Sequence, residues 1–333
     1  MILVTGGAGF IGSNLIAGLE SADLGPIAVA DRLDADERWR NIAKREIAAI
    51  VPPEDLGPWL EAHASRLDGI FHLGAITATT ASDAGEVVAT NVTLSQRLWD
   101  HCAAHNTPFI YASSASVYGD GSQGFDDDLD PSAMGKLRPL NLYGWSKLLF
   151  DRWIARIVAD GGPRPDLWAG LRFFNVYGPN EAHKGPQSSV VPHFFGQIQA
   201  TGRARLFKSD RDDVEDGGQA RDFIFVDDCV DAMIWLYQSR NLGNGDGSGL
   251  YNLGTGTART FLDLAHAVFA AIGNKADIEF FDMPTELKAH YQYFTQAPMD
   301  RLHDAGYEAA PTQLEAGIRT YVTDFLAADD PYR

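Results

Sequence analysis

The chain opens on an apolar segment that runs straight into three regularly spaced glycines. Residues 1–4 are apolar, Gly6, Gly9 and Gly12 follow, and an amphipathic helical pattern extends from Phe10 to about residue 19. Glycine permits a tight turn between a strand and a helix, and it lets backbone amides at the helix N-terminus approach a pyrophosphate. A glycine spacing alone also fits a turn with a purely structural role. Between a strand and a helix, it predicts a dinucleotide-binding site.

Charged residues after the second apolar segment bear on which dinucleotide binds. Asp31 ends the segment 26–31, where an acid commonly hydrogen-bonds the ribose 2′-hydroxyl of NAD and repels a 2′-phosphate. Arg32 follows it directly, and Arg38 and Arg40 lie in the loop beyond. Because guanidinium groups bind phosphate oxygens and offset the acid, we expect NADP rather than NAD.

Length and charge restrict the class of protein. The 333 residues suffice for about two domains. The net charge of −18, from 27 basic and 45 acidic residues, argues against nucleic-acid or anionic-membrane partners, which need basic patches. No apolar stretch approaches the roughly 20 residues of a membrane span, and no signal peptide is recognisable, so we expect a cytoplasmic protein. Cys102 and Cys229 predict reduced, buried thiols rather than a disulfide or a metal site.

Short apolar segments alternate with helical patterns along the first half of the chain. This alternation predicts an α/β fold with a Rossmann-type, doubly wound and mostly parallel sheet. The expected strands are 27–30, 69–72, 109–112 and 167–173, and the expected helices lie near 55–65, 86–105 and 142–159.

The pattern changes after Asn175, where Gly-Pro pairs and a polar stretch at 209–221 indicate loops. The acidic run 210–216 reads as a solvated insertion, or alternatively as an ordered lid. Residues 221–228 predict a strand that enters a helix, and 251–254 predict another short strand. We therefore expect an NADP-binding domain over 1–174 with a returning segment near 222–250, and a smaller α/β substrate-binding domain formed mainly by 175–221 and 251–333.

A tyrosine and a lysine four residues apart indicate chemistry. Tyr143 and Lys147 lie on one face of the predicted helix 142–159, so the phenol and the ammonium project together. A cation ~5 Å away at an effective dielectric of ~20 stabilises a phenolate by about 3 kcal/mol, and an oxidised nicotinamide adds a further positive charge. Such a pair takes a proton from an alcohol as hydride leaves its carbon; the alternative is an exposed pair on a helix flank. Ser113 and Ser114 end a predicted parallel strand, where a hydroxyl can bond the same substrate oxygen.

Four motifs together resemble the extended short-chain dehydrogenases/reductases. They are Gly6-Gly-Ala-Gly-Phe-Ile-Gly12, Ser113-Ser-Ala-Ser-Val-Tyr-Gly119, Tyr143-x-x-x-Lys147 and Phe174-Asn-Val-Tyr-Gly-Pro179. Within that superfamily, three further stretches resemble the ADP-L-glycero-D-manno-heptose 6-epimerases, and the match runs from Met1 to about Tyr321. These stretches are Asn175-Val-Tyr-Gly-Pro-Asn-Glu-Ala-His-Lys-Gly185, Arg221-Asp-Phe-Ile-Phe-Val226 and Tyr291-Gln-Tyr-Phe-Thr-Gln-Ala297.

The resemblance implies a homo-oligomeric enzyme with bound NADP that inverts C6 of the heptose in an ADP-linked sugar for the lipopolysaccharide inner core. The C6 hydrogen has no neighbouring carbonyl, so hydride removal to a ketone and return to the opposite face replace direct deprotonation. Two proton-transfer groups serve the two stereoisomers. By the resemblance these are Tyr143 and Lys184, with Lys147 and Ser114 completing the catalytic set. Without the family, Lys184 would read as an ordinary loop lysine.

The resemblance also implies binding residues. Arg221 is expected to bind the nucleotide diphosphate, with a surface ion pair to Asp222 as the alternative reading. The implied substrate-binding residues are Ser114, Asn175, His193, Phe207, Arg221 and Tyr291. The implied cofactor-binding residues are Gly6, Gly9, Phe10, Ile11, Gly12, Asp31, Arg32, Arg38, Leu73, Asn91, Tyr143, Lys147, Val176 and Lys184.

The chain departs from the family pattern at three places. Leu73 stands where relatives often have a glutamate, Pro186 replaces a serine, and the acidic segment 210–218 looks longer than usual. These departures concern substrate contacts more than the reaction type.

Three alternatives differ in class or substrate. A 4,6-dehydratase places Asp-Glu beside the serine, and this chain has Ala115-Ser116, which argues against it. A UDP-sugar 4-epimerase shares the fold but has no role for Lys184. A non-catalytic dinucleotide-binding scaffold does not need the Tyr143–Lys147 pair, and both residues are retained.

Overall fold

The computed structural model describes residues 1–34, 37–239, 247–288 and 291–333. Its largest element is a seven-stranded sheet in the order β10-β6-β5-β4-β1-β2-β3, in which every pairing is parallel. Because both faces are covered, its strands are apolar runs rather than alternating ones. The fold class predicted from the sequence is confirmed. The strands are β1 Ile2–Thr5, β2 Ile27–Ala30, β3 Ile47–Val51, β4 Gly69–His72, β5 Phe109–Ser114, β6 Trp168–Phe173 and β10 Gly249–Leu253.

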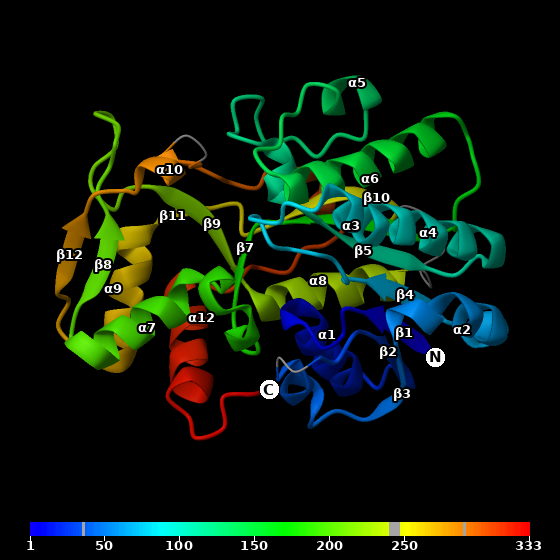
Figure 1. The fold of residues 1–333 in the computed structure, drawn as a ribbon, viewed down its shortest axis with the longest axis horizontal. Helices are drawn as coiled ribbons and strands as arrows, with labels where there is room; N and C mark the ends of the chain where they lie inside the picture. The colour runs from blue at the N-terminus through cyan, green and yellow to red at the C-terminus, as the bar shows by residue number, and fades with distance from the viewer. Residues whose placement is uncertain (35–36, 240–246, 289–290) are drawn as a thin grey trace.

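Helices cover the two faces of this sheet (Figure 1). The long helices α4 (Leu94–His105) and α6 (Leu142–Ala159) lie over one face, and α1 (Phe10–Ser21) and α8 (Val226–Ser239) pack together over the other. The other helical segments before β7 are η1 Arg38–Ile42, η2 Pro53–Asp55, α2 Leu56–His63, η3 Ala64–Arg66, α3 Ala84–Val88, η4 Ala89–Thr93, η5 Ala115–Tyr118 and α5 Pro131–Met134.

The strand order reverses between β1 and β4, which lie side by side although the chain forms β2 and β3 between them. At such a switch point the connections after neighbouring strands leave in opposite directions and open a crevice at the carboxyl ends. The glycine turn after β1 and the loop after β4 meet there. The fold therefore presents the predicted dinucleotide site where ligands of open α/β sheets bind.

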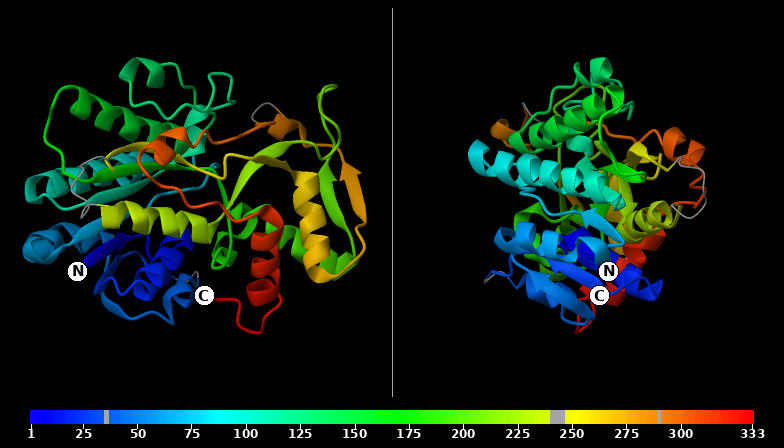
Figure 2. Two further views of the ribbon diagram at one scale, coloured as in Figure 1. Left: turned by 180° about the vertical axis from the view of Figure 1, so that it is seen from behind. Right: turned by 90° about the vertical axis from the view of Figure 1, so that its right-hand side faces the viewer.

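A second group of elements lies beside the large sheet (Figure 2). Two small sheets, β11-β9-β7 and β12-β8, pack with α7, α9 and α12 around a second hydrophobic cluster that includes Phe194, Phe225 and Phe269. Residues 299–307, which include α11, pack instead on the cluster of the large sheet. The domain boundaries expected from the sequence stay a proposal. The elements are β7 Asn175–Tyr177, η6 Ala182–Gln187, α7 Val190–Thr201, β8 Ala204–Phe207, β9 Ala220–Phe225, β11 Ala258–Thr260, α9 Phe261–Ile272, β12 Ile278–Phe281, α10 Thr285–Lys288, α11 Asp300–Asp304, α12 Leu314–Tyr321 and η8 Val322–Leu326.

A buried polar chain joins β1, β4 and α4 beneath the crevice. Thr5 Oγ1 lies 2.7 Å from His72 Nδ1, and His72 Nε2 lies 2.8 Å from Ser95 Oγ. The Ser95 hydroxyl donates to the Asn91 carbonyl at 2.8 Å, so its oxygen accepts from His72 Nε2–H, and Nδ1 accepts from the Thr5 hydroxyl. Thr5 Oγ1 in turn accepts the Gly74 amide at 3.1 Å. The neutral imidazole thus connects the loop after β4 to the helix behind it.

Protonation of His72 disrupts this chain, which makes stability depend on pH. Burial, with a smaller contribution from the Lys147 charge, lowers the pKa of His72 from 6.5 to about 3. Between pH 6.5 and 3, His72 is protonated in the unfolded chain but stays neutral in the folded chain. The free energy of unfolding therefore falls as pH drops toward 3. We expect the free energy of unfolding of the wild type, relative to His72→Gln, to fall by about 1.4 kcal/mol per pH unit between pH 6 and 4.

Urea titrations of both proteins at several pH values measure this difference. Comparison with His72→Gln cancels the carboxylates that titrate in the same range. A difference that stays constant between pH 6 and 4 would contradict the neutral assignment of His72.

Candidate active site

The turn after β1 forms a cradle of bare backbone amides. Gly9 is the N-cap of α1, and no side chain caps the helix, so its first amides are left for a ligand. Gly6 has φ +68°, and a Cβ at Gly12 would lie 2.2 Å from the Gly6 carbonyl oxygen. These glycines are therefore needed for the close turn itself. The cradle fits the pyrophosphate of a dinucleotide, as the sequence predicted.

Asp31 is fixed at the end of β2 by donors on three sides. Its carboxylate accepts the amides of Ala8 at 2.9 Å and Arg32 at 2.8 Å, and Arg38 Nη1 lies 3.2 Å from it. Arg38 also donates to the Arg32 carbonyl at 2.7 Å. Arg38 thus offsets the acid as predicted. The Arg32 side chain instead forms an exposed ion pair with Glu54.

Two of the residues expected to bind the cofactor, Asn91 and Leu73, contact or belong to the loop after β4. Both make hydrogen bonds within the protein. The Asn91 side chain accepts the Ile76 amide at 2.8 Å, donates to the Ile76 carbonyl at 2.9 Å, and donates to Ser146 Oγ at 3.0 Å. Asn91 is buried and ties this loop to α6. Leu73 is half-buried, and its amide donates to the Thr5 carbonyl at 3.1 Å.

The tyrosine of the predicted pair stands in the first turn of α6, which begins after Asn141. The Asn141 side chain accepts the Gly144 amide at 2.8 Å and so caps the helix. The Tyr143 hydroxyl interacts with the Ser114 hydroxyl at the end of β5. Ser114 Oγ also accepts the Ser116 amide at 3.1 Å, which orients it. The strand end and the helix therefore bring the predicted serine and tyrosine together.

Lys147 is buried beneath this pair. Its Nζ donates to the Ala112 carbonyl of β5 at 2.8 Å. Burial lowers the pKa of Lys147 to about 8, and the Asp151 carboxylate opposes this shift. Burial raises the pKa of Tyr143 above its ordinary value, the Ser114 hydroxyl lowers it, and Asp151 raises it. The sequence argument expected Lys147 to lower the phenol pKa; in this structure desolvation is the largest influence, and the group that lowers the pKa of Tyr143 is the Ser114 hydroxyl.

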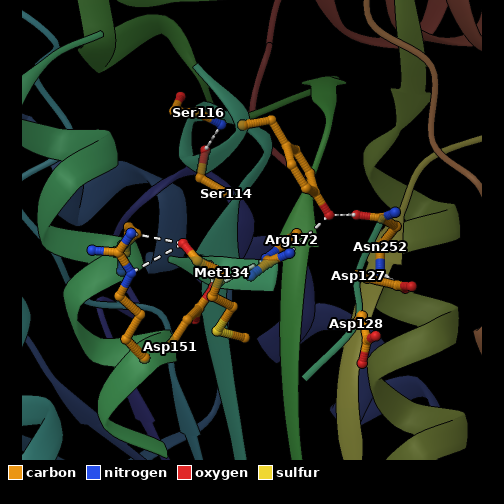
Figure 3. A network of polar contacts seen from close by, with 12 residues as sticks. Ser114, Ser116, Asp127, Asp128, Met134, Asp151, Arg172 and Asn252 are labelled. Atoms are coloured by element: carbon orange, nitrogen blue, oxygen red, sulfur yellow. Dashed lines mark hydrogen bonds and ion pairs between the residues drawn. The ribbon is translucent and has the colours of Figure 1, made fainter. Parts of the chain in front are cut away.

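Behind the pair lies a buried ion pair that the sequence analysis missed (Figure 3). Asp151, one turn beyond Lys147, accepts Arg172 Nε of β6 at 3.0 Å and has no exposed surface. It also accepts the hydroxyls of Tyr111 at 3.1 Å and Ser113 at 2.9 Å. Asp151 therefore fixes the end of β5 next to Ser114. The i, i+4, i+8 spacing of Tyr143, Lys147 and Asp151 was the available signal.

The network continues from Arg172 toward the loop after η5. Arg172 Nη1 donates to the Tyr118 hydroxyl at 2.9 Å, and that hydroxyl donates to Asn252 Oδ1 at 2.6 Å. The Asn252 amide in turn donates to Asp127 at 2.6 Å. Figure 3 shows these residues drawn from β6, β10 and the loop around 125–128. The ends of neighbouring strands are thus fixed by one continuous set of contacts.

Lys184 lies in the loop between β7 and α7. Its ammonium nitrogen is 5.4 Å from the centroid of the Phe10 ring at the start of α1. Burial lowers the pKa of Lys184, and the Glu181 carboxylate raises it. Its neighbour His183 contacts Asn41 of η1 at 3.2 Å. The Lys184 ammonium is therefore partly desolvated. It lies beside the N-terminus of α1, next to the cradle of backbone amides.

Arg221 and Tyr291 lie together in the second group of elements. The Arg221 guanidinium lies over the rings of Tyr291 at 5.2 Å and Phe261 at 5.6 Å, and it donates to the Gln292 carbonyl. Phe207 meets Tyr291 edge-on at 6.2 Å. Arg221 is buried, so the alternative reading as a surface ion pair with Asp222 is wrong. The Asp222 carboxylate instead accepts backbone amides of Thr255, Gly256 and Ala297.

The remaining predicted residues are more peripheral. His193 is exposed on α7 and contacts Ser188 at 3.1 Å. Asn175 is exposed at the start of β7 and accepts the Thr295 hydroxyl at 3.4 Å. Val176 and Ile11 are half-buried and pack on both hydrophobic clusters.

The acidic insertion is an ordered loop closed by its own contacts. The Ser209 amide donates to Asp216 at 2.7 Å, and Arg211 pairs with Asp213 at 2.6 Å. The Asp210 amide donates to the Tyr293 hydroxyl at 2.9 Å, and Asp210 also pairs with Lys288. The insertion therefore adjoins the segment that carries Tyr291.

Two chemical groupings result from this geometry. The first, around Ser114, Tyr143 and Lys147, places a hydroxyl, a phenol and a buried amine at the carboxyl edge of the sheet. The second pairs Lys184 with Phe10 beside the amide cradle. A turn of backbone amides can bind phosphate, and hydroxyl, phenol and amine groups can exchange protons; an alcohol oxidation with a dinucleotide requires both. Across the described ranges, no helix is long and apolar enough to cross a membrane.

Comparison with known proteins agrees with this geometry. Residues 2–254 match the family model of the NAD dependent epimerase/dehydratase family. The ADP-L-glycero-D-manno-heptose-6-epimerase of Nitratidesulfovibrio vulgaris (strain DP4) is 45% identical, and that of Fusobacterium nucleatum is 40% identical, each over 100% of both chains. The crystal structure of the Helicobacter pylori ADP-L-glycero-D-manno-heptose-6-epimerase has a TM-score of 0.77 at 27% identity, covering 98% of this chain and 96% of that one.

A structure with a bound dinucleotide has the same fold. The Thermus thermophilus UDP-glucose 4-epimerase in complex with NAD has a TM-score of 0.74 at 24% identity and covers 98% of this chain and 99% of its own. The matching family is described as NAD dependent. The chain belongs to the NAD-dependent epimerase/dehydratase family, in which its full length resembles the ADP-L-glycero-D-manno-heptose-6-epimerases.

Proposed function

We propose that this protein is an NADP-dependent epimerase that inverts C6 of the heptose in ADP-D-glycero-D-manno-heptose. The product, ADP-L-glycero-D-manno-heptose, would supply the lipopolysaccharide inner core. Support comes from the end-to-end identity of 40–45% with relatives of that name. The observation that carries the proposal is the presence of two ionisable groups on separate elements. Tyr143 on α6 lies with Ser114 at the end of β5, and Lys184 lies in the loop between β7 and α7.

The proposed reaction has two parts, hydride transfer at carbon C6 and proton exchange at the C6 hydroxyl oxygen. An oxidised nicotinamide bound at the glycine turn would supply the hydride transfer, from the C6 carbinol and back to the other face of the resulting ketone. Tyr143 exchanges the hydroxyl proton for one stereoisomer, and Ser114 hydrogen-bonds the same oxygen. Lys184 exchanges the proton for the other stereoisomer, and its lowered pKa brings it nearer the working range of an acid–base group. Lys147 stays buried and donates to the Ala112 carbonyl, one helical turn after Tyr143 on α6.

Other residues would hold the cofactor and substrate. The cradle of Gly6, Gly9 and Gly12 would hold the pyrophosphate, and Arg38 beside Asp31 would bind at the adenosine ribose. Arg221 and Tyr291 form a cationic and aromatic surface suited to the nucleotide diphosphate. The homo-oligomeric state and the cytoplasmic location remain predictions of the family resemblance and of the sequence.

Substrate turnover tests the proposed reaction. The purified protein with dinucleotide should interconvert the two ADP-heptose isomers, separated by chromatography, and should leave UDP-galactose unchanged. Turnover of UDP-galactose alone would favour the 4-epimerase. Dinucleotide binding without turnover of either sugar would favour the scaffold.

Conservative replacements test the two proton-transfer groups. Tyr143→Phe and Lys184→Met should each lower kcat for epimerisation by about 10²–10⁴-fold, because each removes one acid–base group. The double variant should lose much less than the product of the two losses, since both groups serve one cycle. All three variants should still unfold in a cooperative thermal transition and still bind the dinucleotide, which shows that they are folded. The exposed Lys136→Met is the matched control; near wild-type turnover by Lys184→Met would refute the two-group assignment.

Arg38 provides a test of cofactor preference. In Arg38→Met the Asp31 carboxylate loses its guanidinium partner and repels a 2′-phosphate. We expect the Kd of NADP to rise by at least about tenfold and that of NAD to change little. Exposed Arg164→Met serves as the control for net charge. Equal or tighter binding of NAD by the wild type, measured by calorimetry, would contradict the NADP assignment.

A further inference from the structure

The loop that carries Lys184 also contains a fully buried carboxylate that has no part in the mechanism above. Glu181 has no exposed surface. Its side chain lies between the two ends of the loop, since it accepts the Gly178 amide at 3.5 Å and the Ser189 hydroxyl at 2.6 Å. It also accepts the Ser189 amide. One side chain thus joins the residue after β7 to the N-cap of α7.

The partners of Glu181 favour its ionised form. Every side-chain contact is made by a donor: two backbone amides, the Ser189 hydroxyl and the Tyr321 hydroxyl of α12. Burial raises the pKa of Glu181, while Ser189, Lys184 and Gly178 lower it. A protonated carboxyl in this place would turn a hydrogen toward groups that already donate.

Lys184 carries the positive charge that acts on Glu181. The Lys184 amide donates to the Glu181 carbonyl at 3.0 Å, so one turn of η6 separates the two side chains. Around them, α1 contributes the Phe10 ring and α12 the Tyr321 phenol. His183 turns to Asn41 of η1.

The chain terminus also lies nearby but is already paired. The Arg333 amide donates to Asn180 Oδ1 at 3.0 Å, and its guanidinium pairs with Asp227 of α8. Among the residues that the structure describes, Glu181 is the charge that acts on the pKa of Lys184.

We infer that Glu181 is a positioning residue that fixes the lysine loop and supplies a negative charge one turn of η6 away from Lys184. This inference rests on the proposed acid–base role of Lys184. Burial in the loop disfavours the ammonium, and a fixed carboxylate offsets that cost. The Glu181 side chain also holds residues 178 and 189 together. The conformation of the loop and the charge next to Lys184 therefore both depend on this carboxylate. Neither effect requires contact with the substrate.

Charge removal at constant size tests the electrostatic effect. Glu181→Gln keeps one side-chain oxygen as acceptor for the Ser189 hydroxyl, loses the negative charge, and turns its NH2 group toward the Ser189 backbone amide. We expect the pH midpoint for amine labelling of Lys184 to fall by about one unit. Competitive labelling with acetic anhydride across pH, read by peptide mass spectrometry, measures this midpoint without any need for turnover. The descending limb of the epimerisation pH profile should move in parallel.

Tyr321→Phe is the matched control. It removes a donor to the same carboxylate and leaves the charge in place. Its Lys184 midpoint should stay within a few tenths of a pH unit of the wild type. Thermal unfolding and dinucleotide binding establish that each variant is folded. A Lys184 midpoint that is the same in wild type, Glu181→Gln and Tyr321→Phe would overturn the inference.

A second measurement does not depend on the folding of Glu181→Gln. If the two charges interact, Lys184→Met raises the pKa of Glu181 in the folded state. The free energy of unfolding of the wild type, relative to Lys184→Met, should then grow as pH rises from 4 to 7.5. Lys184→Arg, which keeps the charge, should show no such growth. A difference that is independent of pH would also overturn the inference.

The outcomes distinguish this inference from the proposed function. A midpoint that moves in Glu181→Gln, together with full epimerisation by Lys184→Met, would support the charge coupling and refute the catalytic role of Lys184. An unmoved midpoint, together with a large loss in Lys184→Met, would retain the catalytic lysine and refute the role of Glu181.

Discussion

Desolvation of ionisable groups at the carboxyl edge of the sheet is the constraint on which the rest of the site depends. It is the largest influence on the pKa values of Tyr143, Lys147, Lys184 and Arg221 alike. A buried charge without partners costs several kcal/mol, so each group needs a fixed donor or acceptor. Lys147 has the Ala112 carbonyl, and His72 stays neutral within its hydroxyl chain. The polar networks behind the site follow from this requirement.

The Asp151–Arg172 pair shows how such a network serves position rather than net stability. Both side chains are fully buried, and a hydrophobic pair of similar volume is often as stable as a buried ion pair. Removal of only one partner destabilises the fold, because it leaves an uncompensated charge in the core. Asp151 also accepts the Ser113 hydroxyl, which sets the end of β5 and with it Ser114. The pair therefore makes the strand end rigid where the substrate oxygen would bind.

Local pattern predicted the large sheet well. The expected strands 27–30 and 69–72 coincide with β2 and β4, and the helix 142–159 coincides with α6. These segments are buried, so their apolar runs are unbroken and easily recognised. β3 was not among the expected strands, although Ile47–Val51 is also an apolar run; in the structure it lies at the sheet edge, and its first four residues alternate between partly buried and exposed positions. The pairing of β8 with β12 joins segments far apart in the chain and leaves no local trace.

The site was predictable where a motif carries it and not where tertiary contacts do. The glycine turn and the Tyr143–Lys147 spacing are local, and the family resemblance supplied Lys184. Glu181 stands in the same quoted stretch, yet nothing in the sequence says that it is buried, because its partners Ser189 and Tyr321 come from other elements. The raised pKa of Tyr143 was missed for the same reason: spacing reveals the nearby lysine but not the loss of water around the phenol.

In the proposed reaction, inversion at one carbon needs a proton-transfer group on each side of that carbon. The two candidate groups stand on separate elements of the fold. Tyr143 stands on α6, which is held by an N-cap and by β5. Lys184 stands on a loop whose ends belong to β7 and α7, so it is attached to the smaller sheets. A rigid helix and a clamped loop can thus face one sugar from different directions. If the loop were free, the lysine would be solvated and its pKa would return toward that of a surface amine. For the proposed reaction, the buried carboxylate that clamps the loop is therefore a condition for Lys184 to act as the second proton-transfer group.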